Sequence, residues 1–450
     1  MKTASFRVIA CLTMLGMSGA MPAAQAWDGP PPPVQTSHPP TVLRHGTLWT
    51  ATGEVLVDTD ITLQDRKILA IGKNLPLPAQ GIEVDVRGKI VTPGLVDMHS
   101  HLGVYAAPQV RANADGNEMT APTTPAVRAL DAFDPEDPAI ARALAGGVTT
   151  ALILPGSGNV VGGQAFYAKL YGHTVADMAI ANPPRAMKWA MGENPKRVYG
   201  GRSQMPMSRM GHGWILRKLL MDAKEIKDQQ DAWDHNASHV GARPARGELE
   251  PIIALLRGEV LLQVHCYEVH DIETLLRIAD EFHFQVAAIH HALEAWKVPR
   301  LLVDHHVGVA TFADLWGYKM EAYDASTQGP KILHESGVTL ALKTDHPVID
   351  AQYLIHEAQK AHFYGLSQQA ALQAVTRNPA KLIGLANRIG TLEVGKEADV
   401  LVWPTSPLQL AAQPERVFVG GVQVVGDGQN KQSAYAGPAH PTGHVCGCED

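Results

Sequence analysis

Short stretches that alternate apolar and polar residues occupy both ends of the 450-residue chain. "TVLRHGTLWT" and "ITLQDRKILAIG" lie in about residues 42–90, and "ADVLVW" and "ERVFVGGVQVVG" lie in 390–428. A period of two residues between turn-forming residues is typical of half-buried strands. We therefore predict a small β-sandwich domain built from both chain ends, with residues 42–90 as its first part and 390–428 as its second.

The middle of the chain, residues 91–389, alternates strand-like runs with helical periodicity. "EVLLQVHC" (259–266) predicts a buried strand, and "DIETLLRIADEFHF" predicts a helix with Asp271 as its N-cap. Apolar residues of this helix recur at three- or four-residue intervals: Ile272, Leu275, Leu276, Ala279 and Phe282. "QVAAIHH" is strand-like again, which completes a βα unit of a parallel sheet. The predicted fold class is α/β, a (β/α)8 TIM-type barrel over residues 91–389.

The first 26 residues have the composition of a secretory signal peptide. Lys2 and Arg7 precede an apolar run that ends in the small-residue triplet "AQA". We expect cleavage after residue 26 and export, to the periplasm if the source is a Gram-negative cell. After cleavage we expect no membrane association, because no later segment is long and apolar enough to span a bilayer.

Two further segments are expected to lie outside the folded domains. Residues 27–41 form a proline-rich lead-in, and 429–450 form a flexible His/Cys tail. The tail holds Cys446 and Cys448 beside two histidines, so a soft-metal or redox clip is the alternative to a plain tail. The sequence does not decide the role of these cysteines.

Composition narrows the class of partner. The chain is 45% hydrophobic and 18% charged, with a formal net charge of -7, which is typical of a globular protein. It contains no basic block, so we expect no nucleic-acid partner and instead a small-molecule substrate. Homo-oligomers are common among such proteins, and a dimer is the commonest form.

Potential metal ligands follow four of the predicted strands. His99 and His101 end the run "VTPGLVDM", and two residues apart in a strand they point to the same side. His265 ends "VLLQV", the pair His290-His291 ends "VAAI", and Asp345 follows "VTLALKT". The carboxyl ends of barrel strands meet at the active-site face, so these side chains predict a metal centre. Alternation cannot decide between the adjacent His290 and His291.

Several motifs resemble the amidohydrolase superfamily in its imidazolonepropionase-like branch. They run in the expected order over nearly the whole mature chain and include "PGLVDMHSH", "GGVTTALILPGS", "IHHALEAW", "LALKTDHPV" and "AVTRNPAKLIGLANRIGTLEVGKEADVLVW". The resemblance implies that His99 and His101 hold the more buried of two metal ions. It also implies that His265 and His291 hold the more exposed ion, and that Asp345 contacts metal and transfers protons. His291 is favoured over His290 because the family places this histidine three residues before a glutamate, here Glu294.

The residue that bridges the two metal ions has two candidates in "AMKWAMGENPKRVYG". Many relatives use a carboxylated lysine and others a glutamate. We favour Glu193, which precedes Asn-Pro at an expected strand end, over a carboxylated Lys188. The cofactors implied are two divalent metal ions, with zinc expected and manganese, iron or cobalt as alternatives.

The function predicted is an exported amidohydrolase that cleaves a C–N bond in an amide, a dipeptide or a cyclic amide. Two cations that share a water lower its pKa toward neutrality, and the resulting hydroxide attacks the carbonyl. Asp345 would accept the proton and pass it to the leaving nitrogen. Candidate substrate contacts are Tyr267, Arg202 and Tyr318.

Three alternatives remain open from the sequence. Glu268 completes an H-x-x-E motif that resembles the mononuclear deaminases of the superfamily. An N-deacetylase that uses a glutamate ligand is the second alternative. A non-catalytic binding protein is the third, which the full ligand set argues against.

Overall fold

The computed structural model describes residues 38–236 and 241–426. The predicted signal peptide (1–26), most of the proline-rich lead-in and the whole predicted tail (429–450) lie outside the described residues. Within the described part of the chain, no helix has both the length and the apolar character needed to cross a membrane.

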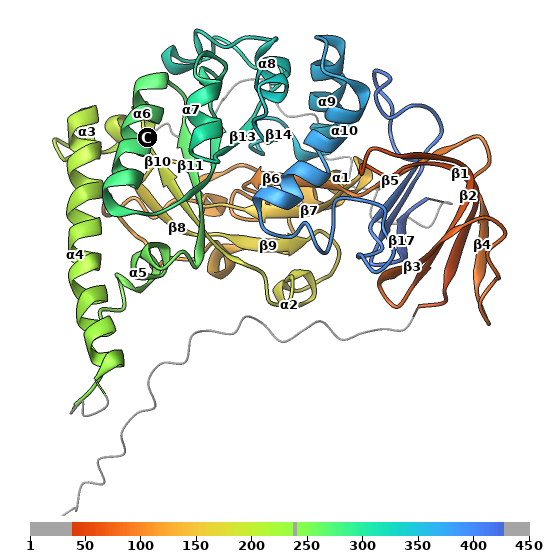
Figure 1. Ribbon diagram of the computed structural model, residues 1–450, viewed down its shortest axis with the longest axis horizontal. Coiled ribbons are helices and arrows are strands. Elements are labelled where there is room, and N and C mark those ends of the chain that lie inside the picture. Colours follow the sequence, from red (N-terminus) through yellow and green to blue (C-terminus); the bar gives the residue numbers. More distant parts are fainter. Residues whose placement is uncertain (1–37, 237–240, 427–450) are drawn as a thin grey trace, which may run out of the picture.

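The two chain ends join in one eight-stranded mixed sheet, in the order β17-β16-β15-β5-β1-β2-β3, with β4 paired to β1. Its strands are β1 (Thr41–Trp49), β2 (Val55–Gln64), β3 (Lys67–Gly72), β4 (Ile82–Asp85), β5 (Ile90–Pro93), β15 (Val400–Trp403), β16 (Arg416–Val419) and β17 (Val422–Val425). Leu43, Ile61, Val400 and Phe418 meet in a common core, so both ends are needed to bury it. The strands predicted as a β-sandwich therefore form one continuous hydrogen-bonded sheet around that core, at one end of the molecule (Figure 1).

The middle of the chain forms two further sheets. Their strands are β6 (Leu95–Ser100), β7 (Val148–Ile153), β8 (Val161–Gln164), β9 (Phe166–Lys169), β10 (Arg185–Ala190), β11 (Val260–Cys266), β12 (Val286–His291), β13 (Gly308–Thr311) and β14 (Leu340–Leu342). Six of them follow the order β14-β13-β12-β11-β10-β8, and three follow β6-β7-β9. From β10 to β14 all neighbours are parallel, as the βα pattern predicts.

The two sheets meet at both edges, which gives a barrel-like arrangement without one closed sheet. On one side β8 and β9 follow each other in the chain and pair antiparallel with β10 and β7. On the other side the backbone amide of Asp345 donates to His99 O, and that of His101 donates to His346 O, both at 3.0 Å. The prediction of a regular (β/α)8 barrel with parallel strands throughout is therefore wrong at β8 and β9, where the chain runs antiparallel.

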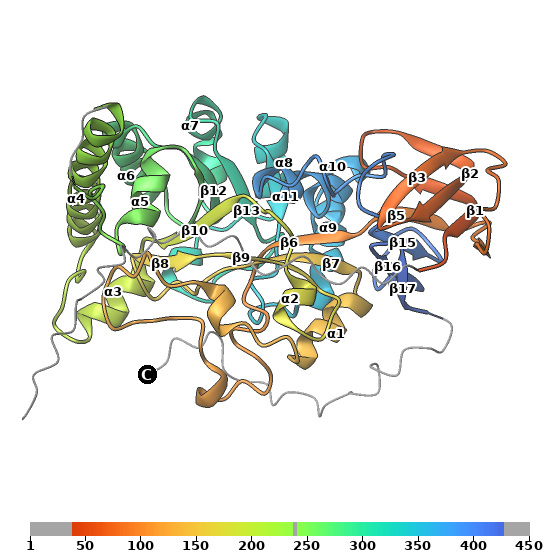
Figure 2. The ribbon, with the colours of Figure 1, turned by 90° about the horizontal axis from the view of Figure 1, so that it is seen from below.

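Helices cover the outside of these strands (Figure 2). They are α1 (Pro138–Ala145), α2 (Val175–Met178), α3 (Glu193–Gly200), α4 (Arg209–His235), α5 (Glu250–Leu256), α6 (Val269–Phe282), α7 (Pro299–Asp304), α8 (Gly329–Glu335), α9 (Leu354–Phe363), α10 (Gln368–Ala374) and α11 (Arg377–Leu382). The 27-residue helix α4 lies at the end of the molecule opposite the terminal sheet (Figures 1 and 2).

Helix α6 confirms the predicted apolar stripe but not its predicted cap. Ile272, Leu275 and Leu276 are buried, as the helical spacing requires. Glu268 occupies the N-cap position, and Asp271 lies inside the helix. The Asp271 carboxylate accepts a hydrogen bond from Arg209 Nε at 2.9 Å. The side chain predicted to cap the helix therefore forms a tertiary ion pair instead.

A buried ion cluster connects the barrel to the terminal sheet. Lys169 Nζ at the end of β9 lies 2.8 Å from Glu397 and also contacts Asp399, just before β15. Arg388 donates to Glu397 from a third segment at 2.7 Å. Burial alone would raise the pKa of Glu397, but these two cations lower it to about 2. The cluster therefore stabilises the contact between the two parts while its carboxylates are ionised.

Candidate metal centre

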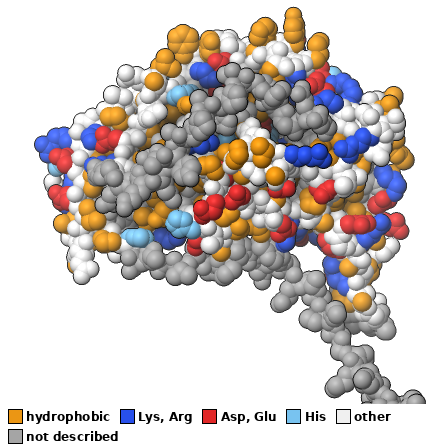
Figure 3. Space-filling model, turned by 180° about the vertical axis from the view of Figure 1, so that it is seen from behind, with side chains coloured by type: hydrophobic (Ala, Val, Ile, Leu, Met, Phe, Trp, Pro, Cys, Tyr) orange, Lys and Arg blue, Asp and Glu red, His pale blue; other side chains and the backbone are white. Residues whose placement is uncertain are grey.

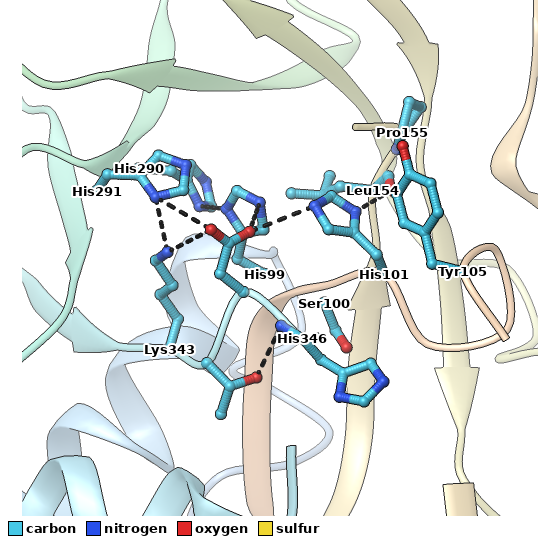
Figure 4. A network of polar contacts seen from close by, with 12 residues as sticks. His99, Ser100, His101, Tyr105, Leu154, Pro155, His290, His291, Lys343 and His346 are labelled. Carbon is cyan, nitrogen blue, oxygen red and sulfur yellow. Dashed lines mark hydrogen bonds and ion pairs between the residues drawn. The ribbon is translucent and has the colours of Figure 1, made fainter. Parts of the chain in front are cut away.

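Three predicted ligands meet where β6 and β14 end (Figure 4). Asp345 Oδ1 lies 3.0 Å from His99 Nε2 and 3.3 Å from His101 Nε2. All three residues are buried. The alternation of β6 places both histidines on the barrel interior, as predicted from their spacing, and a positive φ of 56° turns Asp345 toward them.

His265 and His291 stand beside this group. Their ring centroids are 4.3 Å apart, and the ring of His291 is 4.9 Å from that of His99. Both residues are buried, yet neither ring nitrogen of His265 nor Nε2 of His291 has a hydrogen-bond partner among residues 38–236 and 241–426. Buried polar atoms in this condition are costly unless a ligand satisfies them. Neutral imidazole is the commonest metal ligand in proteins, so a metal ion would satisfy these nitrogens.

The backbone explains how two adjacent histidines both reach the interior. His291 has a φ of 67°, so strand alternation stops at that residue. Both nitrogens of His290 are engaged: Nδ1 lies 2.8 Å from His99 Nδ1, and Nε2 lies 2.7 Å from Gln263 Oε1. The ring with an available nitrogen is therefore His291, which agrees with the preference drawn from the family resemblance.

A chain of hydrogen bonds fixes the tautomer of His99. Because Gln263 Oε1 can only accept, His290 carries its proton on Nε2 and accepts at Nδ1 from His99 Nδ1–H. Burial lowers the pKa of His290 well below its usual value, so the ring is neutral. His99 then presents an unprotonated Nε2 to Asp345.

The tautomer of His101 is set by a hydrogen bond to the backbone. Its Nδ1–H donates to the backbone carbonyl of Leu154 at 2.8 Å, so in a neutral ring Nε2 is the nitrogen with the lone pair. With both rings neutral, two imidazole lone pairs face one carboxylate oxygen, and Lys188 Nζ lies 3.4 Å from one of these nitrogens, His99 Nε2. A cation between them would remove the repulsion, so these residues fit a divalent metal ion.

The structure separates the two candidates for the bridging ligand. Lys188 lies in β10 and is fully buried, with Nζ 3.4 Å from His99 Nε2 and 3.2 Å from the carbonyl of Pro155. Glu193 begins α3 and is about one-third exposed. Its carboxylate lies 3.9 Å from Lys319 and belongs to no group with the predicted ligands. The expected strand end at Glu193 is absent because β10 stops at Ala190.

Lys343 is a residue of the centre that the sequence did not single out. It is fully buried, with Nζ 2.7 Å from His291 Nδ1 and 3.3 Å from Asp345 Oδ2. Burial lowers the pKa of Lys343 to about 8. Burial would raise the pKa of Asp345, but the charge of Lys343 lowers it well below its usual range. No spacing rule marks this lysine, although its place two residues before Asp345 could have done so.

Two of the three candidate substrate contacts lie near the centre. Tyr267 stacks on His291 with ring centroids 4.8 Å apart and planes 5° apart, and its hydroxyl contacts that of Tyr318. Lys319 Nζ lies 3.9 Å from the centroid of the Tyr267 ring. Arg202, in contrast, is exposed and donates to the backbone carbonyl of Met119 at 2.8 Å, so the structure does not bring it to the predicted ligands.

Known proteins resemble this chain in sequence and fold. Residues 320–424 match the model of the amidohydrolase family. "Amidohydrolase tasK" of Hapsidospora irregularis is 38% identical over 424 residues, which are 85% of this chain but 43% of that protein. The chain thus spans less than half the length of this relative. An imidazolonepropionase of Mesorhizobium japonicum is 24% identical over 76% of this chain and 85% of its own length.

The crystal structure of an amidohydrolase from Thermotoga maritima superimposes with a TM-score of 0.81. Its sequence is 36% identical, and the match covers 86% of this chain and 100% of that one. The fold, the sequence identity and the buried set of candidate ligands therefore agree. The chain belongs to the amidohydrolase superfamily, in its imidazolonepropionase-like branch.

Proposed function

We propose that the protein hydrolyses a C–N bond in a small amide, with dipeptides and cyclic amides as the leading substrate classes. Membership in the amidohydrolase family supports a hydrolase of carbon–nitrogen bonds. The observation that carries the proposal is the convergence of His99 Nε2 and His101 Nε2 on Asp345 Oδ1. Beside them, both nitrogens of His265 and Nε2 of His291 have no hydrogen-bond partner in the described part of the chain. On the face seen in Figure 3, positive and negative side chains of the described residues are interspersed and do not form an extended patch of one sign.

The centre would hold two divalent metal ions, with zinc as the expected element. His99, His101, His265, His291 and Asp345 are the proposed ligands. When bound, such ions polarise a carbonyl group and lower the pKa of water. Among the residues, Asp345 is ionised beforehand and accepts the proton of the attacking water, then delivers it to the leaving nitrogen.

The geometry favours a carboxylated Lys188 over Glu193 as the bridging ligand. A buried lysine amine that takes up CO2 loses its positive charge and gains two oxygen ligands of the kind that hard divalent cations prefer. Lys188 Nζ already lies among the imidazoles, whereas Glu193 faces Lys319. His290 and Gln263 act as positioning residues, since they orient His99 without a free nitrogen of their own.

The glutamates needed for the deaminase and N-deacetylase alternatives lie away from the proposed ligands. Glu268, the proposed deaminase carboxylate, is paired with Arg209 at the start of α6. Glu193, the proposed deacetylase ligand, lies outside the centre. A binding protein without activity can be distinguished from a hydrolase by an activity assay.

We also propose that the chain is exported through its first 26 residues.

Elemental analysis of purified protein never exposed to chelator tests the centre. We expect two equivalents of metal per chain in the native protein and in Glu193→Gln, and a loss of at least one in Lys188→Met. Metal retained in Lys188→Met but lost in Glu193→Gln would overturn the choice of bridging ligand. The absence of metal even after addition of zinc or manganese would overturn the hydrolase proposal.

A panel of dipeptides and cyclic amides then tests the reaction, with release of amine or carboxylate as the readout. The metal-loaded protein should hydrolyse at least one member, and the Asp345→Asn variant should not. If the protein is fully loaded with metal but hydrolyses neither dipeptides nor cyclic amides, the proposed substrate classes are excluded. The binding-protein alternative would then remain.

A further inference from the structure

Three methionines gather at the start of α4, away from the metal centre. Met205 and Met207 precede the helix and Met210 lies in its first turn, within the stretch "MPMSRM". Their exposed fractions are 48%, 62% and 84%, and that of Trp214, one helical turn further on, is 54%. All four side chains line one surface hollow of about 420 Å³. The remaining wall consists of Ser203, Gln204, Ser208 and Gly211.

This hollow contains no charged side chain in its wall. Arg209 lies between the methionines in sequence, but its guanidinium is turned toward Asp271, to which it donates at 2.9 Å, and toward Glu268. The polar groups that remain are two hydroxyls and an amide. The chemistry that the hollow offers is therefore mainly thioether sulfur and one indole ring.

Packing does not account for these side chains. Methionine usually fills gaps in a buried core, where its thioether is apolar and flexible. Three methionines within six residues are instead half to mostly exposed and line one hollow, so their thioethers are accessible from solvent. Thioether sulfur is a soft ligand that selects Cu(I) over harder divalent cations. An indole face can add cation–π attraction to a bound cation.

We propose that Met205, Met207 and Met210 bind a soft monovalent cation of the Cu(I) class, with Trp214 against it. The three rotatable bonds of each methionine allow the sulfurs to close around an ion that is much smaller than the hollow. Thioethers do not titrate, so the affinity is independent of pH between 5 and 8, unlike that of a histidine site. This site is independent of the proposed hydrolase function.

Cu(I) titration of the full-length protein with its native metals in place tests the site. The titration is carried out without oxygen, with bicinchoninate as a competing Cu(I) chelator. Cys446→Ser and Cys448→Ser are introduced first, because thiols of the tail would compete. We expect this background protein to bind one equivalent of Cu(I) with quenching of tryptophan fluorescence, and Met205→Leu/Met207→Leu/Met210→Leu to weaken binding at least tenfold.

Leucine retains the apolar volume and removes only the sulfur, so a surface that docks an apolar partner would survive the triple substitution. The matched control is Met221→Leu/Met320→Leu, which changes two exposed methionines outside the hollow. The control should bind as tightly as the background protein. Equal affinity in the triple variant, equal weakening in the control, or no Cu(I) bound by the background protein would each overturn the proposal.

Discussion

Replacement of Gln263 by leucine should weaken the metal centre without touching a proposed ligand. Gln263 Oε1 accepts from His290 Nε2 at 2.7 Å, and His290 Nδ1 in turn accepts from His99 Nδ1 at 2.8 Å. Without the glutamine, His290 can move its proton to Nδ1 and donate to His99. His99 would then carry its own proton on Nε2, the nitrogen that faces Asp345, and a metal ion would have to displace it.

The expected effect follows from the value of such orienting partners. Loss of a hydrogen bond behind a ligating histidine typically lowers metal affinity roughly 10- to 100-fold. That range corresponds to about 1.4–2.7 kcal/mol of binding free energy. Leucine also leaves His290 Nε2 without a hydrogen-bond partner in a fully buried place, which costs about 1–3 kcal/mol of folding stability.

Competition with a fluorescent chelator measures the metal affinity, and thermal unfolding measures the stability. Gln373→Leu is the matched control, since Gln373 is also buried and donates to a backbone carbonyl, that of Ala51, at 2.9 Å. Both variants should unfold at a lower temperature, but only Gln263→Leu should bind metal more weakly. Equal metal affinity in the two variants would refute the tautomer argument.

Three further predictions concern the chemistry and the fold. Asp345→Asn should lower kcat roughly 10²- to 10⁴-fold in steady-state assays, because the amide cannot accept a proton; a wild-type kcat would exclude the assigned role. The pKa of Glu397 is lowered from 4.5 to about 2, so its stabilising contribution is complete above pH 4.5 and is lost as the pH falls toward 2. That contribution is at most about 3.4 kcal/mol, and urea unfolding at several pH values should show a weaker acid dependence in Glu397→Gln, whereas parallel pH profiles would contradict the shift. Gly146→Ala should destabilise by about 1–3 kcal/mol, because a Cβ there would lie 2.2 Å from the backbone oxygen of Gln352, while Gly247→Ala, with no atom within 4 Å, should unfold like the native protein.

The sequence by itself determined the local elements and most of the residues that meet at the candidate metal centre. Period-two alternation marked the terminal strands, and the stripe from Ile272 to Ala279 marked the buried face of α6. The positions of His99, His101 and Asp345 at strand ends were sufficient to predict that they meet, because parallel strands deliver their carboxyl ends to one face. Local periodicity carries this information since it depends only on nearest neighbours along the chain.

Tertiary structure decided the questions in which two candidates were close in sequence. Lys188 and Glu193 are five residues apart, and only the end of β10 at Ala190 shows which of them faces the histidines. His290 and His291 are adjacent, and the positive φ of His291 together with the hydrogen bond of His290 to Gln263 distinguishes the two rings. Asp271 could cap its own helix, yet Arg209 from α4 binds it instead.

The same holds for features that sequence patterns did not mark at all. The antiparallel course of β8 and β9, the contact of Lys343 with Asp345 and the convergence of three methionines on one hollow all join segments that local rules treat separately. Such contacts depend on backbone direction and on long-range ion pairs. Their energies arise only when the chain has folded, so no short window of sequence contains them.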